Sequence, residues 1–342
     1  MKKKIAVMFG GKSSEHEVSR VSAAFVIKAL DPEKYEVVKI GITKEGEFTL
    51  YEGPVENLPD GSWEKTARHI HMDDIKDLAD FALPIMHGPN AEDGTIQGLL
   101  ELLNMPYGGT GVVGAATAMD KIVAKEIFAD AGLPQIPYVA FTKSRVEDPA
   151  LIEEIAAKLR FPVFVKPANM GSSVGISKVY KKEDLKAAID LAAKYDERLV
   201  VEQGVSKARE LETGIIGNDE LFTAAVGEIR PGADFYDYAA KYTDGASGLI
   251  IPAPITKEQK EKIQSMARTA YRALGCLGYS RVDFLMDGDT EDIYINEINA
   301  IPGFTSLSMF PSLCMEEGMT YSEIIDKIIE LGYERYNAKN NR

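Results

Sequence analysis

The stretch SRVDFLMDGDTEDIYINEIN, residues 280–299, constrains the fold of this chain more than any other. Two apolar runs flank the polar turn DGDTED, a pattern typical of an antiparallel β-hairpin. If the turn is centred near residue 290, Asp283 faces Glu297 across the two strands. The same register places Arg281 opposite Asn299. Because side chains alternate between the faces of a strand, all four then lie on one face.

This face has the chemistry of a site for Mg²⁺ bound to phosphate. Mg²⁺ takes oxygen ligands, keeps several waters and often completes its coordination with phosphate oxygens. Asp283, Glu297 and Asn299 offer such oxygens, whereas the Arg281 guanidinium suits an anion. The alternative is a solvated strand face that carries an Arg–Asp ion pair, and the residue pattern by itself does not decide between the two.

The overall charge argues against two classes of partner. The chain has a formal net charge of −14 and a sequence pI of about 4.9. Nucleic acids and anionic membranes repel an acidic surface, so we expect neither as a partner. No run approaches the ~20 apolar residues that a membrane-spanning helix needs. The only cysteines, Cys276 and Cys314, are too few for a disulfide framework, which favours the cytoplasm.

Length and patterning predict three units. A chain of 342 residues is too long for one compact core. In the first hundred residues, KKKIAVMFGG, YEVVKIGIT and FALPIMHG have the pattern of buried strands, which predicts a parallel α/β layer over 1–109. A smaller central unit is expected over 110–202 and a third over 203–342. The terminal segment YERYNAKNNR has no periodicity and is expected to fray.

Two segments with glycines are candidates for ligand binding. In FVKPANMGSSVGISK, Lys166 ends a strand, and Ser172 and Ser173 lie in a loop whose N–H and O–H groups suit a phosphate. A plain Gly/Ser hairpin loop is the alternative, and the P-loop pattern is absent. Near the amino terminus, Gly10-Gly11 precedes Glu15 at a helix start, where spacing favours an ordinary cap.

His87 follows the apolar strand FALPIM, at the edge where parallel α/β layers bind ligands. A lone histidine is more often a structural hydrogen-bonding group than a catalyst. The other histidines show no metal-ligand spacing, so zinc is not expected.

Seven motifs in sequence order carry a resemblance that spans nearly the whole chain. They are FGGKSSEHEVS, HGPNAEDGTIQGLLE, MDK, VKPANMGSSVGISK, FYDYAAKY, SRVDF and NEINAIPGFTSLS. Together they resemble the D-alanine:D-alanine ligases of the ATP-grasp superfamily. The resemblance implies a three-domain architecture, with an N-terminal parallel α/β domain and two α+β domains clamping ATP. It also implies ligation of two D-alanines for peptidoglycan synthesis, through a D-alanyl phosphate.

The resemblance implies a nucleotide site and a metal site. One group of residues would hold ATP: Lys121, Lys166, Ser173, Glu202, Glu210 and Lys241. Asp283, Glu297 and Asn299 would bind Mg²⁺, or Mn²⁺ in its place. Residues 232–250 are expected to form a loop that orders when nucleotide binds.

The resemblance also implies roles around the two amino acids. Glu15 would bind the first ammonium, with His87 close by. Arg281 and the N–H of Gly303 would stabilise the oxyanion of the tetrahedral intermediate. The second substrate would be positioned by Ser172 and Tyr242, its carboxylate would meet Ser308, and Met309 would contact its methyl group.

Some alternatives stay open at this point. A vancomycin-resistance ligase would make D-alanyl-D-lactate or D-alanyl-D-serine, but Tyr242 in its usual place favours D-alanine. A more distant ATP-grasp ligase would lack the EHEVS and PGFTSLS elements, and a non-enzymatic nucleotide-binding module would not need Arg281 beside Asp283. Asn90-Ala91 stands where relatives often have Tyr-Gly or Gly-Gly, which is expected to alter the loop near His87. A homodimer is common in the family.

Overall fold

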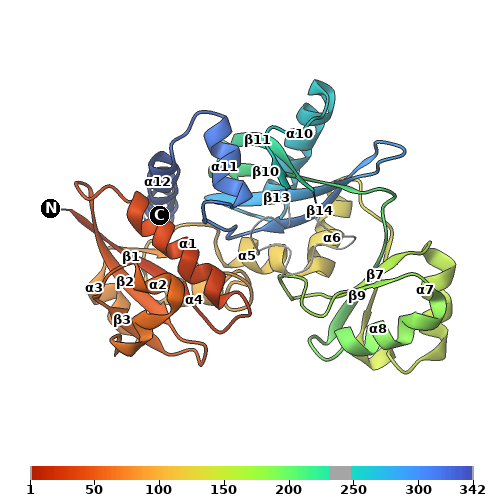
Figure 1. Ribbon diagram of the computed structural model, residues 1–342, viewed down its shortest axis with the longest axis horizontal. Helices are drawn as coiled ribbons and strands as arrows, with labels where there is room; N and C mark the ends of the chain where they lie inside the picture. The colour runs from red at the N-terminus through yellow and green to blue at the C-terminus, as the bar shows by residue number, and fades with distance from the viewer. Residues whose placement is uncertain (1, 231–247, 341–342) are drawn as a thin grey trace.

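The computed structural model describes residues 2–230 and 248–340, whose strands form three sheets (Figure 1). In Figure 1 the first sheet lies at the left and the central sheet at the lower right. The C-terminal sheet lies between and above them, next to α5 and α6.

The first sheet has the strand order β4-β3-β2-β1-β5. Its elements are β1 (Lys3–Gly10), α1 (His16–Ala29), β2 (Tyr35–Ile42), β3 (Phe48–Tyr51), α2 (Asn57–Asp60), β4 (Arg68–His69), α3 (Ile75–Leu78), β5 (Phe81–Pro84) and α4 (Thr95–Leu102), with 3₁₀ turns at Ser62–Lys65 and Met72–Asp74. The three predicted strands, β1, β2 and β5, are parallel, as expected. The antiparallel strands β3 and β4 were not predicted, because they are short.

The core of this unit is shared with the end of the chain. Helix α12 (Tyr321–Asn340) packs Ile324, Ile325 and Ile328 into the same apolar cluster as β1 and β5. The prediction that the terminal segment frays is wrong, since α12 continues to Asn340. The half-buried guanidinium of Arg335 in this segment donates hydrogen bonds to the carbonyl oxygens of Tyr107 and Gly109. Sequence periodicity misses this anchor because it is polar.

The central sheet has the order β6-β9-β7-β8, and all pairs are antiparallel. Its elements are β6 (Tyr138–Thr142), α7 (Pro149–Lys158), β7 (Val163–Pro167), β8 (Ser177–Val179), α8 (Leu185–Ala192) and β9 (Arg198–Gln203), with 3₁₀ turns at Lys143–Arg145 and Lys182–Asp184. Leu185, Ile189 and Ala192 of α8 recur at helical spacing and are buried against β7 and β9.

The C-terminal sheet has the order β12-β11-β10-β13-β14. Its elements are β10 (Arg209–Ile216), β11 (Phe222–Arg230), β12 (Gly248–Ile250), α10 (Lys257–Ala273), β13 (Tyr279–Met286), β14 (Ile293–Asn299) and α11 (Met309–Glu316). The core of this sheet includes side chains from α10 and from α5 (Val112–Met119) and α6 (Lys121–Asp130). The division of the chain near residues 109 and 202 stays our proposal.

The predicted hairpin and its register are confirmed. Asp283 pairs with Glu297 and Arg281 pairs with Asn299, as the turn position requires. Beyond these pairs the register shifts by one residue, between Asp283 and Phe284. Such a bulge bends the strand locally, and it lies directly beside the paired carboxylates.

Helix α11 covers part of the same sheet face because two glycines make room for it. A Cβ on Gly214 would lie 3.0 Å from the ring of Phe310, and a Cβ on Gly227 would lie 2.6 Å from the sulfur of Met309. The remaining part of that face carries the polar side chains of β10, β13 and β14. Within the described ranges, no helix has the length and apolar content needed to cross a bilayer.

Candidate active site

The first wall of the site lies at the carboxyl ends of β1 and β5. Gly10 and Gly11 have φ angles of 85° and 99°, so the chain can turn sharply into α1. Ser19 of α1 accepts a hydrogen bond from the Gly10 N–H and donates one to the carbonyl oxygen of Ile85. The buried hydroxyl of Ser19 is thus fully hydrogen-bonded. Its two bonds hold the amino end of α1 beside both strands.

Glu15 precedes α1 and is 8 % exposed. Its side chain makes no hydrogen bond that caps the helix, although the Ser13 hydroxyl accepts the Glu15 N–H at 3.1 Å. A Cβ added to Gly88 would lie 2.9 Å from Glu15 Oε2, and one added to Gly171 would lie 3.0 Å from the same oxygen. Glu15 therefore lies where the first unit meets the loop of the central unit, and both glycines let the backbone approach its carboxylate.

His87 is buried, and both of its ring nitrogens are engaged within the protein. Nδ1 donates to the carbonyl oxygen of Ile301, 2.9 Å away, and Nε2 lies 3.2 Å from the Ser22 hydroxyl. Burial lowers the pKa of His87, although Glu15 opposes this effect. The ring is therefore neutral at pH 7, which matches one donating and one accepting nitrogen.

Glu92 is a site residue that sequence reasoning missed. Its Oε2 accepts the N–H of Gly88 and its Oε1 accepts the N–H of Ile301, both at 2.9 Å. Burial and the neighbouring Glu15 raise the pKa of Glu92 to about 8, although both N–H groups favour the ionised form. Glu92 belongs to the motif HGPNAEDG that carries part of the family resemblance. The neighbouring sequence does not indicate that its side chain bonds to residue 301.

The loop that carries Glu92 accommodates Asn90-Ala91 by local interactions. Asn90 has a φ of 67°, a left-handed conformation that asparagine tolerates better than most residues. The Asn90 N–H donates to Asp93, and Ala91 is buried in the core beneath the loop. The departure from the usual glycines is thus accommodated locally.

The polar face of the hairpin is built around Arg281. Its Nε and Nη2 atoms donate to the two oxygens of Asp283, each at 2.7 Å. Glu212 on the neighbouring strand β10 lies 2.8 Å from Nε as well. Burial by itself lowers the pKa of the Arg281 guanidinium, but these two carboxylates outweigh burial and raise it. Arg281 is therefore a fixed, permanently charged group.

The three predicted metal ligands are neighbours on this face. Asn299 Nδ2 donates to Asp283 Oδ2 at 2.8 Å, and Glu297 lies directly opposite Asp283. Among the described residues, no three His, Cys, Asp or Glu side chains are grouped as a metal site. Two carboxylates and one amide nevertheless fit Mg²⁺, because this ion keeps waters and shares its coordination with phosphates.

The predicted nucleotide residues gather between the central and C-terminal sheets. Asp120 caps α6 by accepting the N–H groups of Ile122 and Val123, which places Lys121 at the first helical position. Lys121 Nζ donates to the carbonyl oxygen of Met170 at 2.7 Å, and so joins α6 to the loop after Lys166. This loop bends at Ser172 and Ser173, whose φ angles are 47° and 61°.

Glu202 is held by two lysines, one of which sequence reasoning missed. Lys166 Nζ lies 2.5 Å from Glu202 Oε2, and Lys125 Nζ lies 2.8 Å from Oε1. Burial raises the pKa of Glu202, but the two lysines outweigh it and hold that pKa well below its usual range. Burial likewise lowers the pKa of Lys166, whereas Glu202, Glu297 and Glu210 together raise it. Lys166 is thus close to both the predicted nucleotide and the predicted metal residues.

The turn after β14 brings Gly303 and Ser308 together. A Cβ on Gly303 would lie 2.7 Å from Ser308 Oγ, and this hydroxyl accepts the Thr305 N–H at 2.9 Å. Ser308 immediately precedes α11. Met309, by contrast, is 4 % exposed and is buried in the core.

Two predicted residues, Lys241 and Tyr242, lie outside the described residues. So does most of the predicted loop 232–250, whose last three residues form β12.

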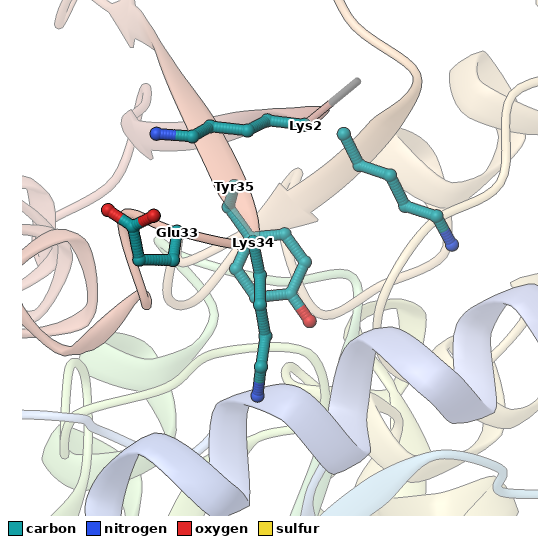
Figure 2. Close-up of a pocket in the computed structure, with 5 residues that line it drawn as sticks. Lys2, Glu33, Lys34 and Tyr35 are labelled. Carbon is teal, nitrogen blue, oxygen red and sulfur yellow. The ribbon is translucent and has the colours of Figure 1, made fainter.

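One surface hollow lies away from this site. A hollow of about 560 Å³ is lined by Lys2, Lys3, Glu33, Lys34 and Tyr35 at the amino ends of β1 and β2 (Figure 2). Lys34 is already paired with Asp326 of α12, 2.6 Å away. Ligands of parallel α/β layers bind at the opposite, carboxyl ends of the strands, where Glu15 and His87 lie.

Comparison with known proteins agrees with this geometry. The family models for the N-terminus and C-terminus of D-Ala D-Ala ligase match residues 4–110 and 127–330. A D-alanine–D-alanine ligase of Thermoanaerobacter sp. is 47 % identical, over 99 % of this chain and 98 % of the relative. One of Acetivibrio thermocellus is 43 % identical, over 98 % and 97 %.

Solved structures give the same result. The VanG D-Ala:D-Ser ligase from Enterococcus faecalis has a TM-score of 0.89 and 38 % identity, covering 97 % of this chain and all of that one. The D-alanine-D-alanine ligase from Coxiella burnetii has a TM-score of 0.86 and 29 % identity, covering 99 % and 96 %. The expected ATP-grasp fold is confirmed, and the chain belongs to the D-alanine–D-alanine ligase family.

Proposed function

We propose that this enzyme joins two D-alanines with the hydrolysis of ATP to ADP and phosphate, for peptidoglycan precursor synthesis. The observation that carries the proposal is the meeting of three parts of the chain at Glu15. That carboxylate lies against Gly88 of the first unit and Gly171 of the central loop, and it partly offsets the lowering of the His87 pKa by burial; His87 in turn contacts the turn at Ile301. Binding of nucleotide alone would not require this junction.

In the first step, a carboxylate oxygen of one D-alanine attacks the γ-phosphorus of ATP, and ADP leaves. Lys121, Lys166 and Lys241 hold the phosphates, with Ser173 in the same loop. Glu202 and Glu210 hold the adenosine part. The positive charges of these lysines offset the repulsion between the D-alanine carboxylate and the ATP phosphates. In phosphoryl transfer a protein acts mainly through such positioning and charge stabilisation. Lys166 suits this role because its pKa is raised and its charge is retained.

Asp283, Glu297 and Asn299 hold Mg²⁺, which would neutralise charge on the phosphates when bound. Within the protein, Arg281 keeps Asp283 in place through two hydrogen bonds of 2.7 Å. Mn²⁺ suits the same oxygen donors.

In the second step, the neutral amine of the other D-alanine attacks the acyl carbon and loses a proton to solvent. The tetrahedral intermediate then expels phosphate as the peptide bond forms. Glu15 binds the ammonium of the first D-alanine, with neutral His87 beside it. Arg281 and the Gly303 N–H stabilise the oxyanion, a task that requires donors fixed in advance. Arg281 meets this requirement through its paired carboxylates.

The second substrate is D-alanine rather than D-lactate or D-serine. Ser172 and Tyr242 position this D-alanine, and Ser308 meets its carboxylate. Met309 is a core residue that lies behind the part of the site that contacts the methyl group of the substrate. The D-alanine–D-alanine ligase of Thermoanaerobacter is more similar in sequence to this chain than the D-Ala:D-Ser ligase of Enterococcus is, at 47 % against 38 %.

Product identity tests this proposal. The enzyme is incubated with ATP, Mg²⁺ and D-alanine in competition with D-serine and D-lactate, across a range of pH. We expect D-alanyl-D-alanine as the main product, in increasing share as the pH rises and the amine becomes neutral. A predominant depsipeptide or D-alanyl-D-serine at neutral pH would overturn the assignment. ATP binding without release of ADP would instead support a binding module.

We also propose a cytoplasmic homodimer without nucleic-acid or membrane partners. The acidic net charge of −14 supports the absence of these partners. Light scattering after size-exclusion chromatography tests the dimer.

A further inference from the structure

The peptide groups of Ile301 are held at both ends by the loop after β5. The Ile301 N–H donates to Glu92 Oε1 at 2.9 Å, and the Ile301 carbonyl oxygen accepts from His87 Nδ1 at 2.9 Å. Ile301 itself is 3 % exposed. His87 and Glu92, five residues apart, thus both bind the backbone of Ile301, which lies more than 200 positions further along the chain.

The other end of the same turn is also tied to the first unit. The Phe304 N–H donates to Ser22 Oγ of α1 at 3.3 Å, and this hydroxyl lies 3.2 Å from His87 Nε2. Between the two anchors lie only Pro302 and Gly303. Proline fixes one backbone angle, so little freedom remains for the N–H of Gly303.

Glu92 connects this turn to the surroundings of Glu15. Its second oxygen accepts the N–H of Gly88, whose Cα is adjacent to the Glu15 carboxylate. One carboxylate therefore sets the distance between Gly88, at the proposed ammonium site, and Ile301, two residues before the proposed oxyanion donor.

We propose that Glu92 is a positioning residue that fixes the Gly303 N–H relative to the first D-alanine by bridging Gly88 and Ile301. The inference rests on the proposed function, because it needs an oxyanion at Gly303. Oxyanion donors act only when they are placed in advance, and a shift of about 1 Å is enough to weaken them strongly. Glu92 makes no contact with substrate in this role, so its effect should fall on the transition state.

The test compares Glu92→Gln, Glu92→Asp and a matched control, Glu101→Gln. Glutamine has one acceptor oxygen, so it keeps one N–H bond and turns an NH₂ group toward the other. Aspartate keeps the charge but is too short to span both partners. Glu101 is also a hydrogen-bonded carboxylate, but its partners are Tyr107 and Lys339, away from the site. Assays at about pH 9 keep Glu92 ionised in the wild type, since its pKa is about 8.

We expect kcat to fall roughly 10- to 100-fold in both Glu92→Gln and Glu92→Asp, because neither side chain accepts both N–H groups, and not at all in Glu101→Gln. KM for ATP should stay within about twofold, and inhibition by a phosphinate analogue of the tetrahedral intermediate should weaken in parallel with kcat. A general loss of structure would instead weaken ATP binding too, which isothermal titration of each variant detects. Should Glu92→Gln fail to fold, Glu92→Asp carries the same comparison.

Unchanged kcat and unchanged analogue binding in both Glu92 variants would overturn the proposal. If wild-type enzyme makes no D-alanyl dipeptide, the proposed function itself fails. The two failures are therefore distinguishable by the wild-type product alone.

Discussion

Lys125 Nζ lies 2.8 Å from Glu202 Oε1, and both side chains are almost completely removed from solvent. The lysine belongs to α6, which packs Ala124 and Phe128 into the core of the C-terminal sheet, whereas Glu202 belongs to β9 of the central sheet. The buried ion pair thus reinforces the contact between α6 and the central sheet that Ile122 and Val200 also make. It also keeps Glu202 charged at the place where we propose that adenine binds.

Lys125→Met should therefore lower both stability and ATP affinity. Removing one partner of a buried ion pair typically costs about 3–5 kcal/mol, and Lys166 would still compensate part of the charge of Glu202. We expect a loss of about 2–3 kcal/mol in the free energy of unfolding, measured by urea denaturation. The control is Lys158→Met, which breaks an exposed pair with Glu154 and should leave the free energy of unfolding nearly unchanged. Equal effects in the two variants would contradict the structural role of Lys125.

Arg281→Ala should lower kcat by about 10²- to 10³-fold while changing KM for ATP little, because an oxyanion donor acts mainly in the transition state. Arg209→Ala is a matched control. Arg209 makes a bidentate ion pair with Glu228. Arg209 lies on the face of the same sheet opposite to the face that carries Arg281. Both variants should lose stability in thermal melts, but only the Arg281 variant should lose turnover. A selective loss of ATP affinity would place Arg281 at the nucleotide instead.

Glu297→Gln should raise the Mg²⁺ concentration required for half-maximal activity by at least about tenfold, because it removes a charged oxygen ligand. Binding of ATP measured by calorimetry as a function of Mg²⁺, without D-alanine, gives a second readout. Glu291→Gln in the exposed turn of the same hairpin is the control. Near wild-type turnover of Glu297→Gln at ordinary Mg²⁺ would refute the metal assignment.

Gly88→Ala should raise KM for D-alanine by roughly tenfold or more. An added methyl group would lie 2.7 Å from Ser13 Oγ and 2.9 Å from Glu15 Oε2, and the φ of 75° adds backbone strain. Gly46→Ala separates the two effects, since Gly46 also has a positive φ but open space around it. Its expected loss is about 1 kcal/mol of stability without a change in KM. A wild-type KM in Gly88→Ala would mean that Glu15 does not bind the substrate.

Much of the fold was predictable because its patterns are local. The alternation in β13 and β14 and the polar turn between them set the register that pairs Asp283 with Glu297. The parallel layer of β1, β2 and β5 followed from apolar runs separated by a helical pattern. Strands β3 and β4 and the last turns of α12 were missed, since the former are short and the latter is anchored by the polar residue Arg335.

The site was predictable only in part. Resemblance identified Glu15, Lys166 and Arg281, but Glu92 and Lys125 have partners 209 and 77 positions away in the sequence. Local sequence carries no signal for such pairs. Spacing also favoured an ordinary helix cap at Glu15. Its side chain makes no cap hydrogen bond and lies instead beside Gly88 and Gly171, which are distant in the sequence.

The sequence by itself determined the longer apolar strands, the hairpin register and the set of chemical groups, because these depend on neighbours along the chain. Tertiary structure decided which of these groups meet. The packing of the sheets decides that Asp283 is hydrogen-bonded by Arg281 rather than solvated. It also decides that the backbone of residue 301 is bound by His87 and Glu92. Packing buries these polar groups, and a buried polar group must find a partner wherever in the sequence that partner lies.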